Sequence, residues 1–233
     1  MIPLKDDTPR FSTPYITYFL IAANTVVFLF QWTLPQRAQE VFVYQFGLIP
    51  SQLIAPLQPG SQVPVEIALL PLLTSMFLHS GWLHLISNMW ALWIFGDNIE
   101  DYLGHFLYLI MYLSGGIVAA LAHTFFNWGS NVPSVGASGA IAAVMGAYFV
   151  LYPRARVLTL VPFFFVFFLW LPAWVVLGYW FTVQFLSGAA TSLSAVGRTG
   201  GGIAFWAHVG GFVFGLLAIR VFPGRTQRYR YGR

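Results

Sequence analysis

The sequence predicts an all-α membrane protein: a bundle of six transmembrane helices with a long first loop that lies in the membrane interface. Of its 233 residues, 58% are hydrophobic and only 8% are charged, and the mean hydropathy is +0.72. A soluble domain carries about 25% charged residues. Long apolar runs recur along the chain, and a helix needs about 20 such residues to cross a bilayer. We therefore expect residues 1–233 to form one membrane domain.

The six predicted spans form a core over residues 14–222, between an N-terminal segment, residues 1–13, and a basic tail, residues 223–233. The spans are Pro14–Leu34, the stretch from after Gly81 to Phe95, His105–Phe126, Ser138–Tyr152, Val157 to about Leu186, and Ile203–Phe222. Pro172 predicts a kink in the fifth span. The Gly-, Ser- and Thr-rich stretch Ser187–Gly202 predicts a mobile loop.

The first loop, Pro35–Leu73, contains several prolines and cannot be one regular helix. Its apolar content is high for a solvated linker, so we expect short helices lying in the membrane interface. After the second span, Asp97, Glu100 and Asp101 predict an acidic turn. Glu100 and Gly104 are expected to tie together the helix ends on that side of the membrane.

Composition excludes several classes of function. Cysteine is absent, so the chain has no disulfide, thiolate nucleophile or cysteine metal site. A metal-dependent reading of His79, His84 and His105 is disfavoured, since no H-E-x-x-H occurs and no span carries a carboxylate ligand. An aspartyl protease is excluded because no span holds a carboxyl pair. The net charge of +4 does not indicate nucleic-acid binding, because the basic residues lie at helix ends and in the tail.

The basic residues are distributed unevenly between the two sides of the membrane. Six spans put both termini on one side, and that side has most of the eleven Lys and Arg residues: Lys5, Arg10, Arg154, Arg156, Arg220, Arg225, Arg228, Arg230 and Arg233. The other side has Arg37 and Arg198. By the positive-inside rule both termini are cytoplasmic, and the predicted location is a bacterial cytoplasmic (inner) membrane. No internal repeat is visible, so a transporter built from inverted halves gains no support.

Four polar residues inside spans form a candidate site. Ser138 begins the fourth span within the run Val135-Gly-Ala-Ser-Gly-Ala140, and a lone run of this kind is weak evidence because small residues also serve helix packing. Counting 1.5 Å per residue, however, Ser138, His208 and His84 lie within about one helical turn in depth. Asn88 follows His84 by four residues, on the same helix face.

This set of side chains suits acyl transfer. Ser138 is the candidate nucleophile, and His208 is the candidate base that accepts its proton. His84 and Asn88 are candidate donors to the oxyanion of a tetrahedral intermediate, and the free N–H of Ser138 can join them. Small residues line one side of each of the two helices involved: Gly139, Ala142, Ala143 and Gly146 in the fourth span, and Ala204, Ala207, Gly211 and Gly215 in the sixth. Such faces allow close backbone approach.

Together, the runs Gly136-Ala-Ser-Gly139, His79-x4-His84-x3-Asn88 and Ala207-His208-x2-Gly211-x3-Gly215 resemble the signature of the rhomboid intramembrane serine proteases. The resemblance covers nearly the whole chain and implies a six-span bundle of rhomboid type. It implies a Ser138–His208 dyad without an Asp, and an oxyanion hole of His84 and Asn88. The family's reaction is endoproteolysis of single-span membrane proteins at small residues near the outer face, without a cofactor.

Two departures from the family pattern and several alternatives remain open. The first loop has no Trp-Arg pair, and Ala142 replaces an aromatic residue that stacks on the base in several members, so another group must orient His208. His79 either shapes the site or is an ordinary interfacial histidine. The aromatic fifth span is either lipid-facing bulk or a lateral gate, with Ser187–Gly202 as a cap. The alternative function is a catalytically silent relative that binds membrane clients. Natural substrate, pathway and oligomeric state are not predicted.

Overall fold

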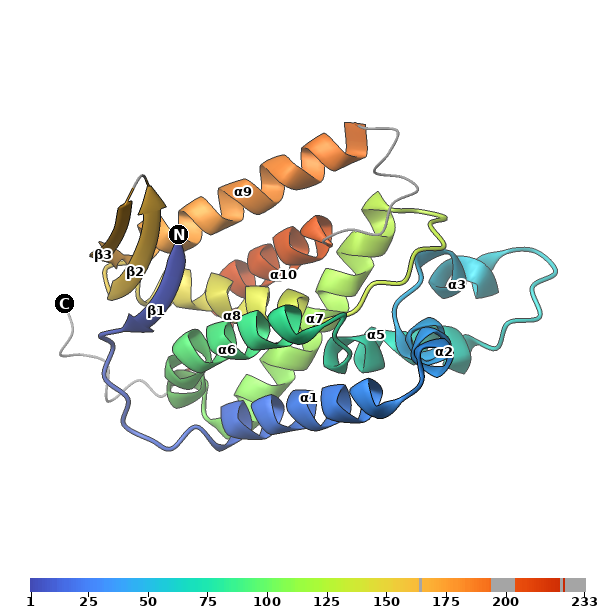
Figure 1. Ribbon diagram of the computed structural model, residues 1–233, viewed down its shortest axis with the longest axis horizontal. Coiled ribbons are helices and arrows are strands. Elements are labelled where there is room, and N and C mark those ends of the chain that lie inside the picture. The colour runs from blue at the N-terminus through green and yellow to red at the C-terminus, as the bar shows by residue number, and fades with distance from the viewer. Residues whose placement is uncertain (164, 194–203, 223, 225–233) are drawn as a thin grey trace.

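A computed structural model describes residues 1–163, 165–193, 204–222 and 224, and these residues are mainly helical (Figure 1). In chain order the elements are β1 Ile2–Asp6, α1 Tyr15–Thr33, α2 Gln36–Phe46, α3 Pro50–Ile54, η1 Ala55–Leu57, α4 Val65–Leu69, α5 Pro71–Thr74, η2 Ser75–Phe77, α6 Trp82–Leu103, α7 His105–Phe126, α8 Ser138–Leu151, β2 Arg156–Phe163, β3 Phe165–Pro172, α9 Ala173–Leu193 and α10 Phe205–Ala218. The structure does not describe the predicted tail, residues 223–233, apart from Gly224. Most of the predicted cap and the first residue of the predicted sixth span also lie outside the described residues.

Three helices among the described residues are long and apolar enough to cross a membrane: α1, α7 and α9. A fourth span is possible if Val65–Phe77 and α6 are counted as one, although the chain bends by 80° between them. The apolar helices α8 and α10 have 14 residues each, or about 21 Å, against a hydrocarbon thickness of about 30 Å. Length and composition therefore support three or four of the six predicted spans.

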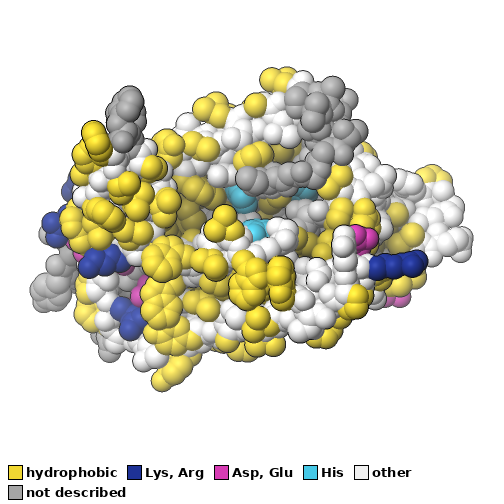
Figure 2. All heavy atoms as spheres, in the orientation of Figure 1, with side chains coloured by type: hydrophobic (Ala, Val, Ile, Leu, Met, Phe, Trp, Pro, Cys, Tyr) yellow, Lys and Arg dark blue, Asp and Glu magenta, His cyan; other side chains and the backbone are white. Residues whose placement is uncertain are grey.

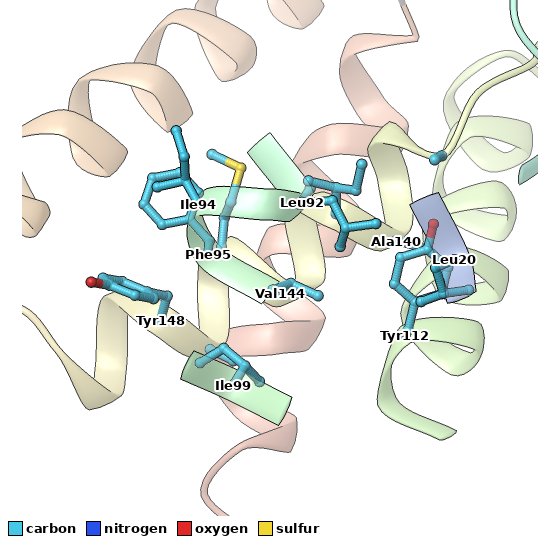
Figure 3. Close-up of a cluster of buried hydrophobic side chains, with 14 of the residues drawn as sticks. Leu20, Leu92, Ile94, Phe95, Ile99, Tyr112, Ala140, Val144 and Tyr148 are labelled. Carbon is cyan, nitrogen blue, oxygen red and sulfur yellow. The ribbon is translucent and has the colours of Figure 1, made fainter. Parts of the chain in front are cut away.

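The short helix α8 lies at the centre of the bundle. It packs mainly against α10, α7 and α6, and its residues from Gly139 to Tyr148 are all buried. Figure 3 shows part of the surrounding core, in which Leu20, Leu92, Phe95, Tyr112 and Val144 come from four helices. The long helix α9 lies along one side of α10 (Figure 1).

The predicted fifth span is wrong over its first half. Strands β2 and β3 form an antiparallel β-hairpin, and β1 pairs with the other edge of β2, so the strand order is β1-β2-β3. Aromatic and β-branched residues favour strands, and a helix through this stretch would contain Pro162. Pro172 ends β3 instead of kinking a helix, and the spanning helix is α9. The start of the predicted loop, Ser187–Leu193, is also helical.

The predicted acidic turn is also wrong, because α6 continues through it to Leu103. Glu100 is fully buried, and its carboxylate accepts hydrogen bonds from the N–H groups of Ile16 and Thr17, both at 2.8 Å. These N–H groups belong to the first turn of α1, where no backbone partner exists. Glu100 also accepts from Thr17 Oγ1 and lies 2.6 Å from His105 Nδ1. The acidic residue thus joins the ends of α1, α6 and α7.

The N-terminal segment forms strand β1, and two of its carboxylates bond to other elements: Asp6 to α8 and Asp7 to β2. Tyr148 donates its hydroxyl to Asp6 at 2.5 Å, and burial raises the pKa of the Asp6 carboxyl. Asp7 accepts from Arg156 Nε at 2.7 Å. Burial alone would raise the pKa of the Asp7 carboxyl, but the bonds and charge of Arg156 lower it overall. The sheet therefore lies at the end of the bundle where the N-terminus is (Figure 1).

Candidate active site

Ser138 is the first residue of α8, and Gly136 shapes the turn that leads to it. Gly136 has φ +128°, a conformation that L side chains rarely adopt. Its N–H donates to the Ser75 carbonyl oxygen at 2.8 Å, and a β-carbon here would collide with the ring of His84. Glycine is therefore required at 136. At the helix start, the N–H groups around Ser138 have no carbonyl partner within the helix.

His208 is buried in α10 and contacts two other helices through its ring nitrogens. Nε2 lies 2.7 Å from Ser138 Oγ in α8, and Nδ1 lies 2.8 Å from Gln184 Oε1 in α9. An amide oxygen only accepts hydrogen bonds, so Nδ1 carries the proton and Nε2 has a free lone pair. Nε2 therefore accepts from the Ser138 hydroxyl. This geometry allows the imidazole to remove the hydroxyl proton.

His84 and Asn88 lie one turn apart on α6 and face Gly136. The N–H and hydroxyl of Ser80 lie 3.5 and 3.0 Å from His84 Nδ1, so Nδ1 accepts and Nε2 carries the proton. Asn88 Nδ2 is buried and has no hydrogen-bond partner among the described residues. Both donors, His84 Nε2 and Asn88 Nδ2, therefore lie next to Gly136, two residues before Ser138. They can receive a negatively charged oxygen that forms there.

The other predicted site residues support this arrangement. Gly139, Gly211 and Gly215 lie where the backbones of α8 and α10 touch. His79 is fully buried, and its ring centroid lies 5.1 Å from that of His84. Its carbonyl oxygen accepts from Gln31 Nε2 at 2.9 Å. His79 therefore packs beside the site. Among the described interactions, it contacts His84 and Gln31 and not Ser138.

Two residues that touch His208 were not predicted from the sequence: Gln184 and Trp180. The Trp180 ring centroid lies 5.6 Å from that of His208, with 37° between the rings. The sequence did contain a signal, because Gln184 is a polar residue in an apolar run, and such residues are costly unless they face a partner. Trp180 on α9 thus makes the aromatic contact with His208 that Ala142 on α8 cannot make. Figure 2 shows histidine side chains near the middle of one face, with hydrophobic side chains nearby.

No group of three or more His, Cys, Asp or Glu side chains that could hold a metal ion occurs in the part of the chain that the structure describes. The site itself contains a hydroxyl, two imidazoles and amide donors. This combination fits proton transfer coupled to nucleophilic attack.

Comparison with known proteins shows the family to which the chain belongs. Residues 68–225 match the Rhomboid domain. The chain is 29% identical over 209 residues to presenilin-associated rhomboid-like protein A, mitochondrial, of Danio rerio, covering 86% of this chain and 46% of the relative. It is 28% identical over 206 residues to rhomboid protein 1, mitochondrial, of Saccharomyces cerevisiae, covering 87% and 51%. Over 76 residues it is 43% identical to rhomboid protease GluP of Bacillus subtilis, covering 33% and 14%.

These relatives correct the predicted location. The proteins that match along most of the chain have mitochondrial names, which contradicts the prediction of a bacterial cytoplasmic membrane with cytoplasmic termini. The prediction failed because an excess of Lys and Arg distinguishes the two sides of a membrane and does not identify the membrane. The chain spans about half the length of these mitochondrial relatives. The Rhomboid domain match nonetheless covers more than half of the chain, and the protein belongs to the rhomboid family.

Proposed function

We propose that this protein is an intramembrane serine endopeptidase that uses Ser138 as the nucleophile and His208 as the base. Rhomboid proteins are generally serine proteases and act on membrane proteins within the bilayer. The observation that carries the proposal is the 2.7 Å contact between Ser138 Oγ and a His208 Nε2 that is free to accept a proton. A hydroxyl becomes a useful nucleophile only beside such a base.

The proposed reaction proceeds in two steps. Ser138 Oγ attacks the scissile carbonyl carbon while His208 Nε2 takes its proton, and the imidazolium then protonates the leaving amine as the C–N bond breaks. Water next attacks the acyl-enzyme carbonyl carbon while His208 Nε2 takes one of its protons. The imidazolium then returns that proton to Ser138 Oγ as the C–O ester bond breaks, which releases a carboxylic acid and restores the hydroxyl. In both steps the oxyanion accepts hydrogen bonds from His84 Nε2, Asn88 Nδ2 and the Ser138 N–H.

The membrane placement that fits this chemistry has six spans in one domain, residues 1–233, with α8 and α10 as short spans. Helix α8 is about 21 Å long, which is less than the thickness of the hydrocarbon region. With the C-terminal end of α8 at the membrane surface near the N-terminal β-sheet, Ser138 at the other end lies below the opposite surface. A pocket of about 370 Å³ opens near the start of α10, between the ends of α7 and α9, and is lined in part by His123, Gly188 and Trp206. Water and an unwound segment of a single-span substrate would enter from that side.

A purified full-length chain in liposomes tests the proposal against a single-span reporter protein. The wild type is expected to cleave the reporter and to be labelled by a fluorophosphonate. Ser138→Ala and His208→Ala are expected to abolish cleavage while keeping the thermal unfolding temperature of the wild type. Cleavage by Ser138→Ala at the wild-type rate would exclude the mechanism.

The second candidate function is a silent relative that binds membrane clients. Such a protein would bind the reporter without cleavage and without labelling by the fluorophosphonate. The hydrogen bond between Ser138 and His208 favours the enzyme, because a protein that only binds has no use for a paired nucleophile and base.

A further inference from the structure

The proposed mechanism uses one ring nitrogen of His208, and the other contacts α9. Nδ1 lies 2.8 Å from the side-chain oxygen of Gln184. We propose that Gln184 is a positioning residue: its amide oxygen accepts a hydrogen bond from His208 Nδ1–H and thereby keeps the Nε2 lone pair directed at Ser138. This inference rests on the proposed function and adds a residue to it.

The chemistry requires such an acceptor. A neutral imidazole carries its single proton on one nitrogen, and only the tautomer with the proton on Nδ1 can accept from a serine hydroxyl through Nε2. When Nε2 takes the serine proton, the ring becomes positively charged, and its bond to the Gln184 oxygen becomes charge-assisted and stronger. Gln184 therefore favours the charged state that forms during attack, although less than a carboxylate would.

Contacts from α9 also hold the His208 ring in place. Trp180 lies one turn before Gln184, on the same face of the helix, and its ring packs against His208. The helix itself is joined to α10 by the contact of Phe181 with Phe212, at 4.9 Å between centroids, and by Trp206 Nε1, which donates to Ser192 Oγ at 2.9 Å. The base is therefore oriented by α9, whereas Ala142 on α8 is too small to do so.

Two substitutions separate this role from simple packing. Gln184→Leu keeps the side-chain size and removes the acceptor, whereas Gln184→Glu keeps an acceptor oxygen but adds a charge inside the membrane. If Gln184 only fills space, leucine is the better replacement, because a buried charge is costly in lipid. If it positions His208, glutamate is better. Thr182→Val, on an exposed part of α9 where Oγ1 bonds only to the Gly178 carbonyl among its described contacts, is the matched control.

The measurement is kcat and KM for reporter cleavage in liposomes, with wild type and Ser138→Ala in parallel. We expect Gln184→Leu to lower kcat by roughly 100-fold or more, since a positioned base contributes about 10²–10⁴-fold, with KM nearly unchanged. Gln184→Glu should retain more activity than Gln184→Leu, and Thr182→Val should match the wild type. If Gln184→Leu does not fold, Gln184→Met, which is unbranched, carries the same expectation.

The outcomes distinguish the two proposals. Wild-type kcat in Gln184→Leu, or higher activity in Gln184→Leu than in Gln184→Glu, overturns the role of Gln184 and leaves the serine mechanism intact, provided that Ser138→Ala is inactive. An inactive and unlabelled wild type overturns the proposed function itself.

A separate observation concerns the β2–β3 hairpin. Six consecutive residues of β3, from Phe165 to Trp170, are apolar and exposed by 43–76%. Both faces of the strand are therefore uncovered, and β3 is also the outer strand of the sheet. Such a strand in water would aggregate. Because β3 leads directly into the apolar helix α9, lipid is the environment that it fits.

The charged residues near the hairpin indicate which region of the bilayer it contacts. Lys5 Nζ lies 5.6 Å from the centroid of the Trp170 ring, and the Arg156 guanidinium, which also pairs with Asp7, lies 5.8 Å from it. Figure 2 shows Lys and Arg side chains next to the hydrophobic ones at the end of the molecule where the hairpin lies. Trp beside Lys and Arg is typical of membrane interfaces, where cations meet anionic headgroups. We infer that the hairpin binds the bilayer interface, with β3 among the upper acyl chains.

The absence of cysteine from the chain makes this contact measurable. Phe168→Cys, labelled with an environment-sensitive fluorophore in liposomes that contain anionic lipid, should be quenched by a nitroxide on the lipid and protected from aqueous iodide. Asn131→Cys, at an exposed polar position in the loop between α7 and α8, is the control and should show the opposite pattern. Equal iodide quenching at both sites would overturn the inference. Energy transfer between labelled copies, without quenching by the lipid nitroxide, would also overturn it, because a second copy of the chain would then cover Phe168.

Discussion

Gly211 in α10 lies against the carbonyl oxygen of Gly139 in α8, so close that no side chain fits between them. The same contact recurs one turn later, where a β-carbon at Gly215 would collide with the Ala143 carbonyl oxygen. Because Ser138 and His208 lie on these two helices, the 2.7 Å contact between them depends on this close approach.

Gly211→Val should therefore separate the helices. Overpacking typically costs about 1–3 kcal/mol, and the added branched side chain meets rigid backbone, so we expect a lower thermal unfolding temperature in detergent together with loss of cleavage. Val213→Ala, on an exposed position of the same helix, is the control and should shift stability by less than about 0.5 kcal/mol. Wild-type activity in Gly211→Val would show that the helix contact does not align the pair.

Much of the helical framework could be predicted from the sequence. The first and third spans agree with α1 and α7 because each is a single apolar run bounded by proline, glycine or polar residues. The hairpin could not be recognised, since Arg156–Pro172 is as apolar as a span, and pairing with β1 across more than 150 residues leaves no local signal. The acidic turn was predicted wrongly for a related reason. Glu100 can be buried within α6 because α1, which is distant in sequence, supplies its hydrogen-bond donors.

The site was predictable where residue chemistry is specific and unpredictable where it depends on the neighbouring helix. A serine, two histidines and an asparagine inside spans are rare enough to be noticed. Gln184 was overlooked because its role exists only once α9 lies beside α10. The count of spans could not be settled by length, since α8 is shorter than a bilayer is thick.

Asn88 Nδ2, which has no hydrogen-bond partner among the described residues, leads to a second prediction. Asn88→Ala and His84→Ala should each lower kcat by about 100- to 1000-fold, the range typical of a single oxyanion donor, with little change in KM. Ser87→Ala is the control, because the Ser87 hydroxyl bonds to the His84 carbonyl oxygen on its own helix. Kinetics of reporter cleavage in liposomes provide the measurement. An unchanged kcat in both variants would remove these residues from the oxyanion site.

The third prediction concerns pH. His208 accepts the serine proton only while its Nε2 is unprotonated, so kcat should fall on the acid side, where a protonated imidazole cannot act as a base. The measurement is the rate of reporter cleavage between pH 3 and 8, with unfolding monitored at each pH to exclude denaturation. A rate that stays flat down to pH 3, in protein that remains folded, would contradict the assignment of His208 as the base.

The last prediction tests the helix junction built on Glu100. Its carboxylate receives two backbone N–H groups of α1 and the Thr17 hydroxyl, and all of these groups are buried or half-buried. In Glu100→Gln an amide NH₂ must face at least one of these donors, which leaves a buried N–H without an acceptor. Hydrogen bonds to charged groups contribute roughly 1.5–3 kcal/mol each, so the unfolding temperature in detergent should fall clearly. Glu66→Gln, at an exposed position, should leave it unchanged. Equal unfolding temperatures for Glu100→Gln and the wild type would show that α1 is held in place by its apolar contacts alone.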